Sequence, residues 1–297
     1  MSHSLSPSTG KAYGLARVCR IWVIPRSTVY FHRQCPSETG KVHRGPDGPC
    51  KDAELAEHIR SVLTGSPFHG EGYRKVWARL RSKGIRTSMR RVLRLMREHD
   101  LLAPRRIRRP SGRKNHDGTI TTEKVDQMWG IDQTSCFTKD EGQVAIFFAV
   151  DHCSMECVGI HAAKSGTRFE ALEPIRQGAR DYLGGFGKGI AAGLSLRHDH
   201  GSQFVSDLFQ QEIAFLGILS SPAYVRKPQG NGCAERFVRI LKENLLWLKP
   251  FRNAEDLREA LLAFRIEYNR NWILQRHGYK TPAQVRRSQS QPTEEAA

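Results

Sequence analysis

The sequence predicts an α/β protein in which a mixed β-sheet is flanked by helices and preceded by small all-helical units. From about residue 119 onward, three strand-like runs come first, and helices and strands then alternate, an order that packs helices against a sheet. Residues 1–118 instead hold 25 Lys and Arg against 9 Asp and Glu, whereas residues 119–297 hold 22 and 21. The chain therefore combines a basic helical part, of the kind that binds a polyanion, with a nearly neutral α/β part.

The basic part contains two helical segments. In residues 15–33, apolar residues recur at helical spacing and are interrupted at Val23-Ile24-Pro25, which is compatible with a helix-turn-helix fragment. Residues 51–102 predict a helical DNA-binding domain of three helices, with Asp52 and then Thr87 or Ser88 as candidate N-caps. We expect the segment 1–50 to include a linker rich in Pro and Gly.

Arginines on the third of these helices are candidates for DNA contact, namely Arg90, Arg91, Arg94 and Arg97. A solvated charged face is the simpler interpretation, but the segregation of charge favours contact with phosphates. Residues 103–122 follow as a basic linker with too little apolar mass to pack a core. We expect its arginines, Arg105, Arg106, Arg108 and Arg109, to follow a phosphate backbone.

The α/β part is predicted to span residues 123–285. We expect strands at 127–137, 143–151, 156–161, 194–197 and 218–223, and helices at 168–183, 204–216, 231–248 and 254–271. The run at 143–151 is almost wholly apolar, as in a strand that is buried on both faces. Residues 286–297 are polar, and we expect them to form a disordered tail.

Three acidic residues in this part point to phosphoryl-transfer chemistry. Asp132 lies inside a predicted strand, where an isolated carboxylate is costly unless it is paired or bound to metal. Asp199 follows a strand end, where α/β sheets bind ligands, and Glu235, separated from Asp199 by 35 residues, begins a helix. Such oxygen ligands suit Mg²⁺ or Mn²⁺, and two ions can activate a hydroxyl and stabilise a leaving oxygen at phosphorus. Each residue alone has a common structural explanation, so the prediction depends on all three.

The helix that carries Glu235 also places polar groups near this predicted site. Asn231 precedes Glu235 by one turn, and Arg239 and Lys242 follow it by four and seven residues. This spacing predicts that the four side chains share one face of the helix. We expect Asn231, Arg239 and Lys242 to contact DNA there.

The chain resembles the OrfB-type transposases of the insertion-element-three family, which have a retroviral-integrase-like DDE core. The three acidic motifs that carry the resemblance are MWGIDQT, LRHDHGSQFVS and PQGNGCAERFVRILKEN. The run HGEGYRKVWARLRSKGIRTSMRRVLRLMREHDLLAPRR looks like the family's helical DNA-binding unit, and YNRNWILQRHGYKTPAQV like its C-terminal signature. Two departures, His200 and the run Arg276-His277-Gly278, remove no acidic residue.

The resemblance implies an RNase H-like fold with Asp132, Asp199 and Glu235 as catalytic ligands of two Mg²⁺, for which Mn²⁺ can substitute. It places Lys242 where the family has a basic residue that contacts DNA near the scissile end. It implies DNA strand cleavage followed by strand transfer at the ends of an insertion sequence. Two alternatives stay open: a Mg²⁺-dependent nuclease of the same fold that does not join strands, and a DNA-binding regulator without catalysis.

The expected partners are double-stranded DNA, as the terminal inverted repeats of an element and as target DNA, and further copies of the chain on that DNA. An upstream OrfA-type protein is a further candidate, because family members are often made as a longer fusion. The seven Cys form no CxxC pair, and no apolar run is long enough to cross a bilayer. We therefore expect a cytoplasmic protein, associated with the nucleoid of a bacterium.

Overall fold

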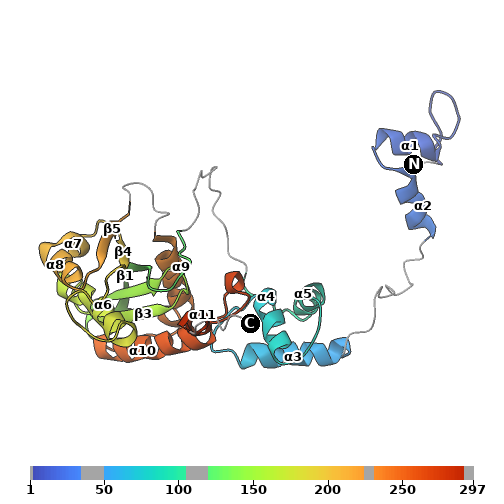
Figure 1. The fold of residues 1–297 in the computed structure, drawn as a ribbon. Helices are drawn as coiled ribbons and strands as arrows, with labels where there is room; N and C mark the ends of the chain where they lie inside the picture. The colour runs from blue at the N-terminus through green and yellow to red at the C-terminus, as the bar shows by residue number, and fades with distance from the viewer. Residues whose placement is uncertain (1–2, 35–49, 105–119, 224–230, 291–297) are drawn as a thin grey trace, which may run out of the picture. The chain divides into compact units, whose positions relative to one another are not determined.

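The computed structural model describes residues 3–34, 50–104, 120–223 and 231–290. The chain divides into two compact units, Met1–Gly48 and Pro49–Ala297 (Figure 1). Among the described residues no helix is long and apolar enough to cross a membrane.

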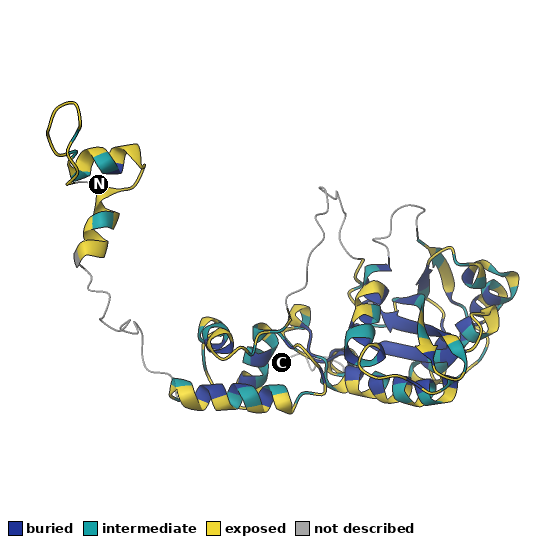
Figure 2. Cartoon of the chain, turned by 180° about the vertical axis from the view of Figure 1, so that it is seen from behind, coloured by how far each residue is buried: buried dark blue, intermediate teal, exposed yellow. Residues whose placement is uncertain are grey.

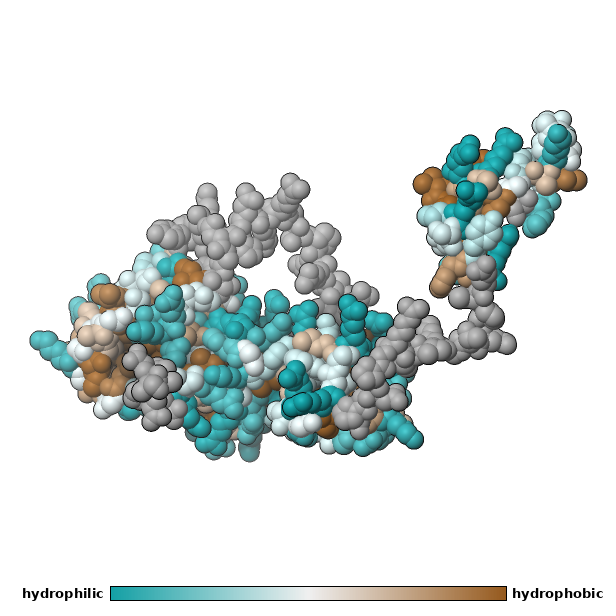
Figure 3. All heavy atoms as spheres, turned by 45° about the vertical axis from the view of Figure 1, so that its right-hand side comes forward, coloured by the Kyte–Doolittle hydropathy of each residue, from teal (hydrophilic) through white to brown (hydrophobic). Residues whose placement is uncertain are grey.

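The first unit contains the two short helices that the sequence predicts, α1 (Leu15–Ile21) and α2 (Arg26–Gln34). Val23 separates them in a left-handed conformation with φ of 54°, which a β-branched residue rarely adopts. Cys19 is the one buried residue among residues 3–33. Apolar side chains, such as Trp22 and Phe31, are therefore exposed on this unit, as the brown surface in Figure 3 illustrates.

Three helices follow at the start of the second unit: α3 (Asp52–Thr64), α4 (Tyr73–Ser82) and α5 (Met89–Glu98). They share a small apolar core, formed by Leu55, Ile59, Val62, Val76, Leu80, Val92, Leu95 and Met96. The hydroxyl of Ser88 accepts a hydrogen bond from the Arg91 amide and so caps α5. The predicted three-helix unit is confirmed, except that Asp52 is the first residue of α3 and not its N-cap.

A five-stranded mixed sheet forms the centre of the unit, in the order β3-β2-β1-β4-β5. Its strands are β1 (Met128–Thr138), β2 (Gly142–Asp151), β3 (Cys157–Ala163), β4 (Ser195–His198) and β5 (Leu219–Pro222). β2 pairs antiparallel with β1 and with β3, whereas β1, β4 and β5 run parallel. The predicted mixed sheet is therefore confirmed, with β1 at its centre.

Helices cover both faces of the sheet, which makes a three-layer structure in which β2, β3 and β4 are almost wholly buried (Figure 2). α6 (Arg168–Tyr182), α7 (Ser202–Val205) and α8 (Asp207–Phe215) pack on one face. α9 (Gly232–Leu241) and α10 (Ala254–Asn271) pack on the other.

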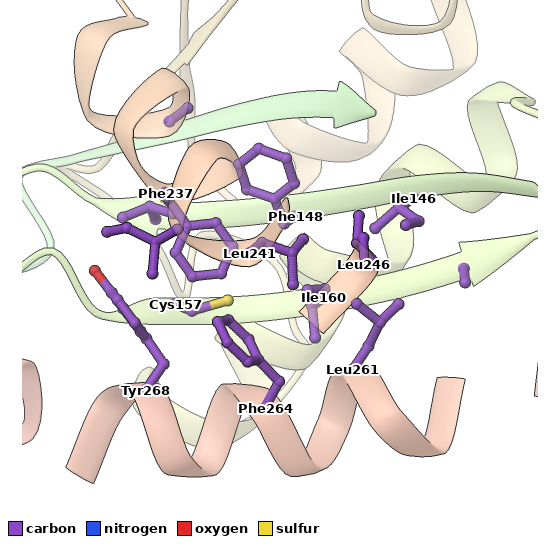
Figure 4. Close-up of a cluster of buried hydrophobic side chains, with 14 of the residues drawn as sticks. Ile146, Phe148, Cys157, Ile160, Phe237, Leu241, Leu246, Leu261, Phe264 and Tyr268 are labelled. Atoms are coloured by element: carbon purple, nitrogen blue, oxygen red, sulfur yellow. The ribbon is translucent and has the colours of Figure 1, made fainter. Parts of the chain in front are cut away.

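The side chains of β2 alternate between these two layers. Val144, Ile146, Phe148 and Val150 join the cluster beneath α9 and α10, and Ala145, Phe147 and Ala149 join the cluster beneath α6 and α8. Figure 4 shows the first cluster, where Phe237 and Leu241 meet Phe148 above Phe264 and Tyr268 of α10. The alternation follows from the two-residue period of a strand and explains why this run is apolar throughout.

The structure differs from the predicted elements in three places. The helix predicted at 204–216 is divided at Ser206, which is extended, into α7 and α8. The helix predicted at 231–248 changes after α9 into a π-helical turn, η2 (Lys242–Leu246). The tail predicted to be disordered from residue 286 begins instead as the end of a helix, α11 (Pro282–Ser290), because Arg286 forms ion pairs with Asp126 and Glu156. Residues 291–297 lie outside the described residues.

Buried polar contacts join the helical unit to the α/β part. Arg79 donates two hydrogen bonds to the buried Glu71 carboxylate, at 2.7 and 2.9 Å, and a third to the Asn271 carbonyl at the end of α10. The Lys75 ammonium lies 2.8 Å from the centre of the Trp272 ring, and burial lowers the pKa of Lys75 to about 7. The two parts therefore belong to one compact unit, while the domain limits at 102 and 123 stay predictions.

Candidate active site

The sheet brings two of the three predicted acidic residues to one edge. β1 and β4 run parallel with Gly130 opposite Arg197. Asp132 and Asp199 each lie two residues beyond that pair, and Asp199 directly follows the end of β4. This register places Asp132 of β1 beside the carboxyl end of β4, where Asp199 lies, so the two acids can form one candidate site.

The pKa of Asp132 is affected by the other charged groups of this site. The pKa of the Asp132 carboxyl is raised to about 6, mainly by burial and to a smaller extent by the negative charges of Asp199 and Glu235. A hydrogen bond of 2.8 Å from the Gln133 amide and the charge of Lys242 act in the opposite direction. Asp132 is therefore within electrostatic range of both other acidic residues and of Lys242.

Asp199 and Glu235 are exposed, in contrast to Asp132. One Asp199 carboxylate oxygen accepts a hydrogen bond of 2.9 Å from the Gly201 amide, which orients this side chain at the start of α7. Glu235 lies in the first turn of α9, where the helix dipole favours a carboxylate. Both carboxylates can therefore receive a ligand from solvent.

Carboxylates such as those of Asp132, Asp199 and Glu235 are ligands that hard divalent cations prefer. Within the parts of the chain that the structure describes, no three His, Cys, Asp or Glu side chains are close enough together to hold one ion. Mg²⁺ is usually bound by only one or two carboxylates, together with water and substrate phosphates. Asp132, which interacts with each of the other two acids, is the residue that could bind two ions at once.

The basic and amide side chains predicted on α9 do not share one environment. Arg239 is exposed, and Lys242, the first residue of the π-helical turn, is half-buried. Asn231 is only 7% exposed, and its Nδ2 donates a hydrogen bond of 2.9 Å to the Ile131 carbonyl oxygen in β1. The Asn231 amide thus binds the sheet, and the predicted DNA contact by Asn231 stays a prediction. The predicted contacts by Arg239 and Lys242 stay predictions.

The four arginines of α5 also divide into two pairs. Arg91 donates to the Asp52 carboxylate and to the Cys50 carbonyl oxygen, both at 2.7 Å, and Arg94 binds both Asp52 and Glu98. Arg90 and Arg97 are exposed. Arg91 and Arg94 thus hold the start of α3 to α5, whereas Arg90 and Arg97 extend toward solvent. Arg105, Arg106, Arg108 and Arg109 lie outside the described residues.

Two glutamines that the sequence reasoning missed connect the acidic segments. Gln203 of α7 donates from Nε2 to Oε1 of Gln133 at 2.9 Å, and Gln133 directly follows Asp132. This bond joins the strand that carries Asp132 to the helix that follows Asp199. A sequence signal existed, because each of the first two acidic motifs contains a Gln within four residues after its Asp.

The two departures from the family pattern have structural roles. His200 bonds through Nε2 to the Ala223 carbonyl oxygen at 2.7 Å. Arg276 donates to the carbonyl oxygens of His152 and Cys153 in the turn between β2 and β3, and His277 also bonds to Cys153. The side chains at both departures thus bind backbone carbonyl oxygens, and none of them is one of the three acidic residues.

Comparisons with known proteins agree with this geometry. Residues 50–109 match the family model of an HTH-like domain, and residues 216–282 match that of an integrase core domain. Transposase InsD for insertion element IS2A/D/F/H/I/K of Escherichia coli is 26% identical over 293 residues, which are 94% of this chain and 93% of the relative. The chain is a homologue of insertion-element transposases. An uncharacterized 48.2 kDa protein of insertion element IS2A, from the same organism, is 26% identical over 95% of this chain but only 66% of its own length.

A solved structure supports the fold. The simian T-cell lymphotropic virus intasome, in complex with PP2A regulatory subunit B56 gamma, contains a chain with a TM-score of 0.50 and 20% identity, over 83% of this chain and 78% of that one. This likeness confirms the predicted RNase H-like fold. The similarity to Transposase InsD and the match to the integrase core domain confirm the resemblance to OrfB-type transposases of the insertion-element-three family and support the class of DDE transposase.

The raised pKa of Asp132 leads to a prediction about stability. An acid whose pKa is higher in the folded state than in the unfolded state contributes stability below its unfolded pKa, and this is lost as pH rises through the folded value. Asp132→Asn keeps the shape of the protonated acid. At pH 7.5 without metal, we expect this variant to melt roughly 3–6 °C above the unaltered transposase. The gain should vanish near pH 4, and an equal gain at both pH values would contradict the assignment.

The division of the α5 arginines leads to a second prediction. Arg90→Ala and Arg97→Ala should weaken DNA binding and each lower the slope of log affinity against log salt by about 1, with melting unchanged. Arg91→Ala should lower the melting temperature, because it leaves Asp52 and the Cys50 carbonyl without this partner. Fluorescence anisotropy at several salt concentrations and thermal melts would measure both effects. Equal melting temperatures for Arg90→Ala and Arg91→Ala would refute the division.

Proposed function

We propose that the chain catalyses Mg²⁺-dependent DNA cleavage and strand transfer at the ends of an insertion element. The observation that carries this proposal is the register of β1 and β4, which brings Asp132 beside Asp199 within electrostatic range of Glu235. The chain's homology to insertion-element transposases supports the same substrate.

Asp132 and Asp199 would hold one cation, and Asp132 and Glu235 a second. When bound, the two ions would activate the attacking oxygen and stabilise the leaving oxygen at phosphorus. The raised pKa of Asp132 shows that its charge is poorly compensated by the protein alone, which favours a cation as the missing partner. Mn²⁺ has similar ligand preferences and is expected to substitute.

The reaction has two steps with the same chemistry. Water first attacks a phosphodiester at the end of the element, which breaks one P–O bond and leaves a free 3′-OH. That 3′-OH then attacks a phosphodiester of target DNA and displaces a 3′ oxygen, so one bond forms as one breaks and no nucleotide triphosphate is consumed.

The chain's own residues would position the DNA. Lys242 lies close enough to Asp132 to influence its charge, so its ammonium can bind a phosphate beside the reacting one. Arg239 on α9 and Arg90 and Arg97 on α5 are exposed cations that can neutralise further phosphates. The bond between Gln133 and Gln203 would keep the two Asp-bearing segments together during the reaction.

The expected partners follow from this reaction. Joining two ends of an element to target DNA requires at least two active sites, so a homo-oligomer on DNA is proposed. An OrfA-type protein remains a candidate partner, and a cytoplasmic site of action near the bacterial nucleoid follows from the substrate.

The acidic residues provide the direct test. Asp132→Ala, Asp199→Ala and Glu235→Ala should each reduce strand joining on the order of a thousandfold or more, while DNA affinity changes little. Glu255→Ala is the control, because Glu255 is an exposed acid on α10 whose partner is Arg258. A gel assay with labelled element ends and Mg²⁺ measures joining, and joining that survives in all three variants would refute the proposal.

A precleaved substrate separates a transposase from a nuclease. An element end that already carries a free 3′-OH needs only the second step, so we expect joined products of increased length from this substrate. A nuclease of the same fold would produce only shorter fragments, and a DNA-binding regulator would shift the substrate in a gel without altering it.

A further inference from the structure

Gly130 occupies a position in β1 where a larger residue would collide with two side chains. A Cβ atom built on Gly130 would lie 2.6 Å from Oδ1 of Asn231 and 2.6 Å from Nε2 of His152. Such distances are far shorter than ordinary van der Waals contact. The side chain of Asn231 thus lies directly against the backbone of β1, in a space that only a glycine leaves open.

Asn231 joins the two elements that carry Asp132 and Glu235. It directly precedes α9, whose first turn contains Glu235. Its Nδ2 donates a hydrogen bond of 2.9 Å to the carbonyl oxygen of Ile131, the residue before Asp132. Because Asn231 is only 7% exposed, water competes little for this bond.

The amide nitrogen of Asn231, Nδ2, makes this connection, and the amide oxygen does not. Oδ1 of Asn231 and Nε2 of His152 have no hydrogen-bond partner within the described part of the chain. Nδ1 of His152 faces the Ile120 carbonyl oxygen at 2.9 Å and so carries the ring proton, since burial keeps this histidine neutral with a pKa of about 4. Nε2 of His152 is therefore an acceptor, as Oδ1 of Asn231 is. An aspartate at position 231 would add a second carboxylate oxygen that faces further acceptors.

We propose that Asn231 is a positioning residue that sets the separation between the Asp132 and Glu235 carboxylates, and that Gly130 is required for it to do so. The proposal rests on the function proposed above. Like charges on Asp132 and Glu235 oppose each other, and the bond to Ile131 holds the start of α9 against β1 despite this repulsion. Loss of the bond would let Glu235 move away from Asp132 and weaken the cation that they share.

Variants with different chemistry should give the same result if this is correct. Asn231→Ala removes the amide, Asn231→Asp removes only the donor at nearly constant shape, and Gly130→Ala displaces the amide without altering it. Asn244→Ala is the matched control, because Asn244 is also buried, follows α9 in the π-helical turn and bonds to the Ile240 carbonyl oxygen and the His69 amide, both at 2.9 Å.

The measurements are Mn²⁺ binding to the DNA-free full chain by electron paramagnetic resonance, the Mg²⁺ concentration for half-maximal joining of precleaved ends, and thermal melting. Asn231→Ala, Asn231→Asp and Gly130→Ala should weaken Mn²⁺ binding by about tenfold or more and raise the Mg²⁺ requirement. Asn244→Ala should lower the melting temperature and leave Mn²⁺ binding unchanged.

The inference would be overturned if Asn231→Ala bound Mn²⁺ as the unaltered chain does, or if Asn244→Ala weakened Mn²⁺ binding equally. Should Asn231→Ala fail to fold, the nearly isosteric Asn231→Asp decides the question by the same comparison. An unaltered chain that neither binds Mn²⁺ nor joins precleaved ends would instead refute the proposed function, so the two failures are distinguishable.

Discussion

The parallel pairing of β1 with β4 is the constraint on which the rest of the structure depends. Gly130 lies opposite Arg197 in this pair, and the register brings Asp132 and Asp199 to the same end of the two strands. β1 also pairs along its whole length with β2. A slip of one residue would turn every side chain of β1 to the opposite face, so the burial of Trp129 and Ile131 against α6, α7 and α8 keeps the register in place. The spacing of the two aspartates is therefore a property of the sheet.

Hydrophobic burial orients the third acid. Phe237 and Leu241 of α9 are fully buried against β2 and α10. Glu235 lies two residues before Phe237 and so projects from the other side of the helix, where it is exposed. The apolar face of α9 thus determines which way its carboxylate points, and the bond from Asn231 to β1 adds a second, polar restraint.

The acidic residues that are paired with an arginine differ from those of the candidate site. The buried carboxylate of Glu71 is compensated by Arg79, and Asp126 and Glu156 are compensated by Arg286. Such pairs join elements that are distant in the sequence. Among the described residues, no arginine is paired with Asp132 in the same way, and its pKa is raised, mainly by burial and less by the charges of Asp199 and Glu235. A carboxyl group with a raised pKa beside other acids at a ligand-binding edge is typical of a functional site.

The sequence by itself determined the strands and most helices, because these depend on local periodicity and caps, and it predicted the three acids from motif spacing. The apolar run at 143–151 and the cap at Ser88 are examples. Only the tertiary structure decided that the Asn231 amide binds the sheet, and that Arg91 is held by Asp52 while Arg90 is exposed. These contacts join residues 100 and 39 positions apart. Spacing along one helix shows which residues share a face, whereas the partner of that face depends on how distant elements pack.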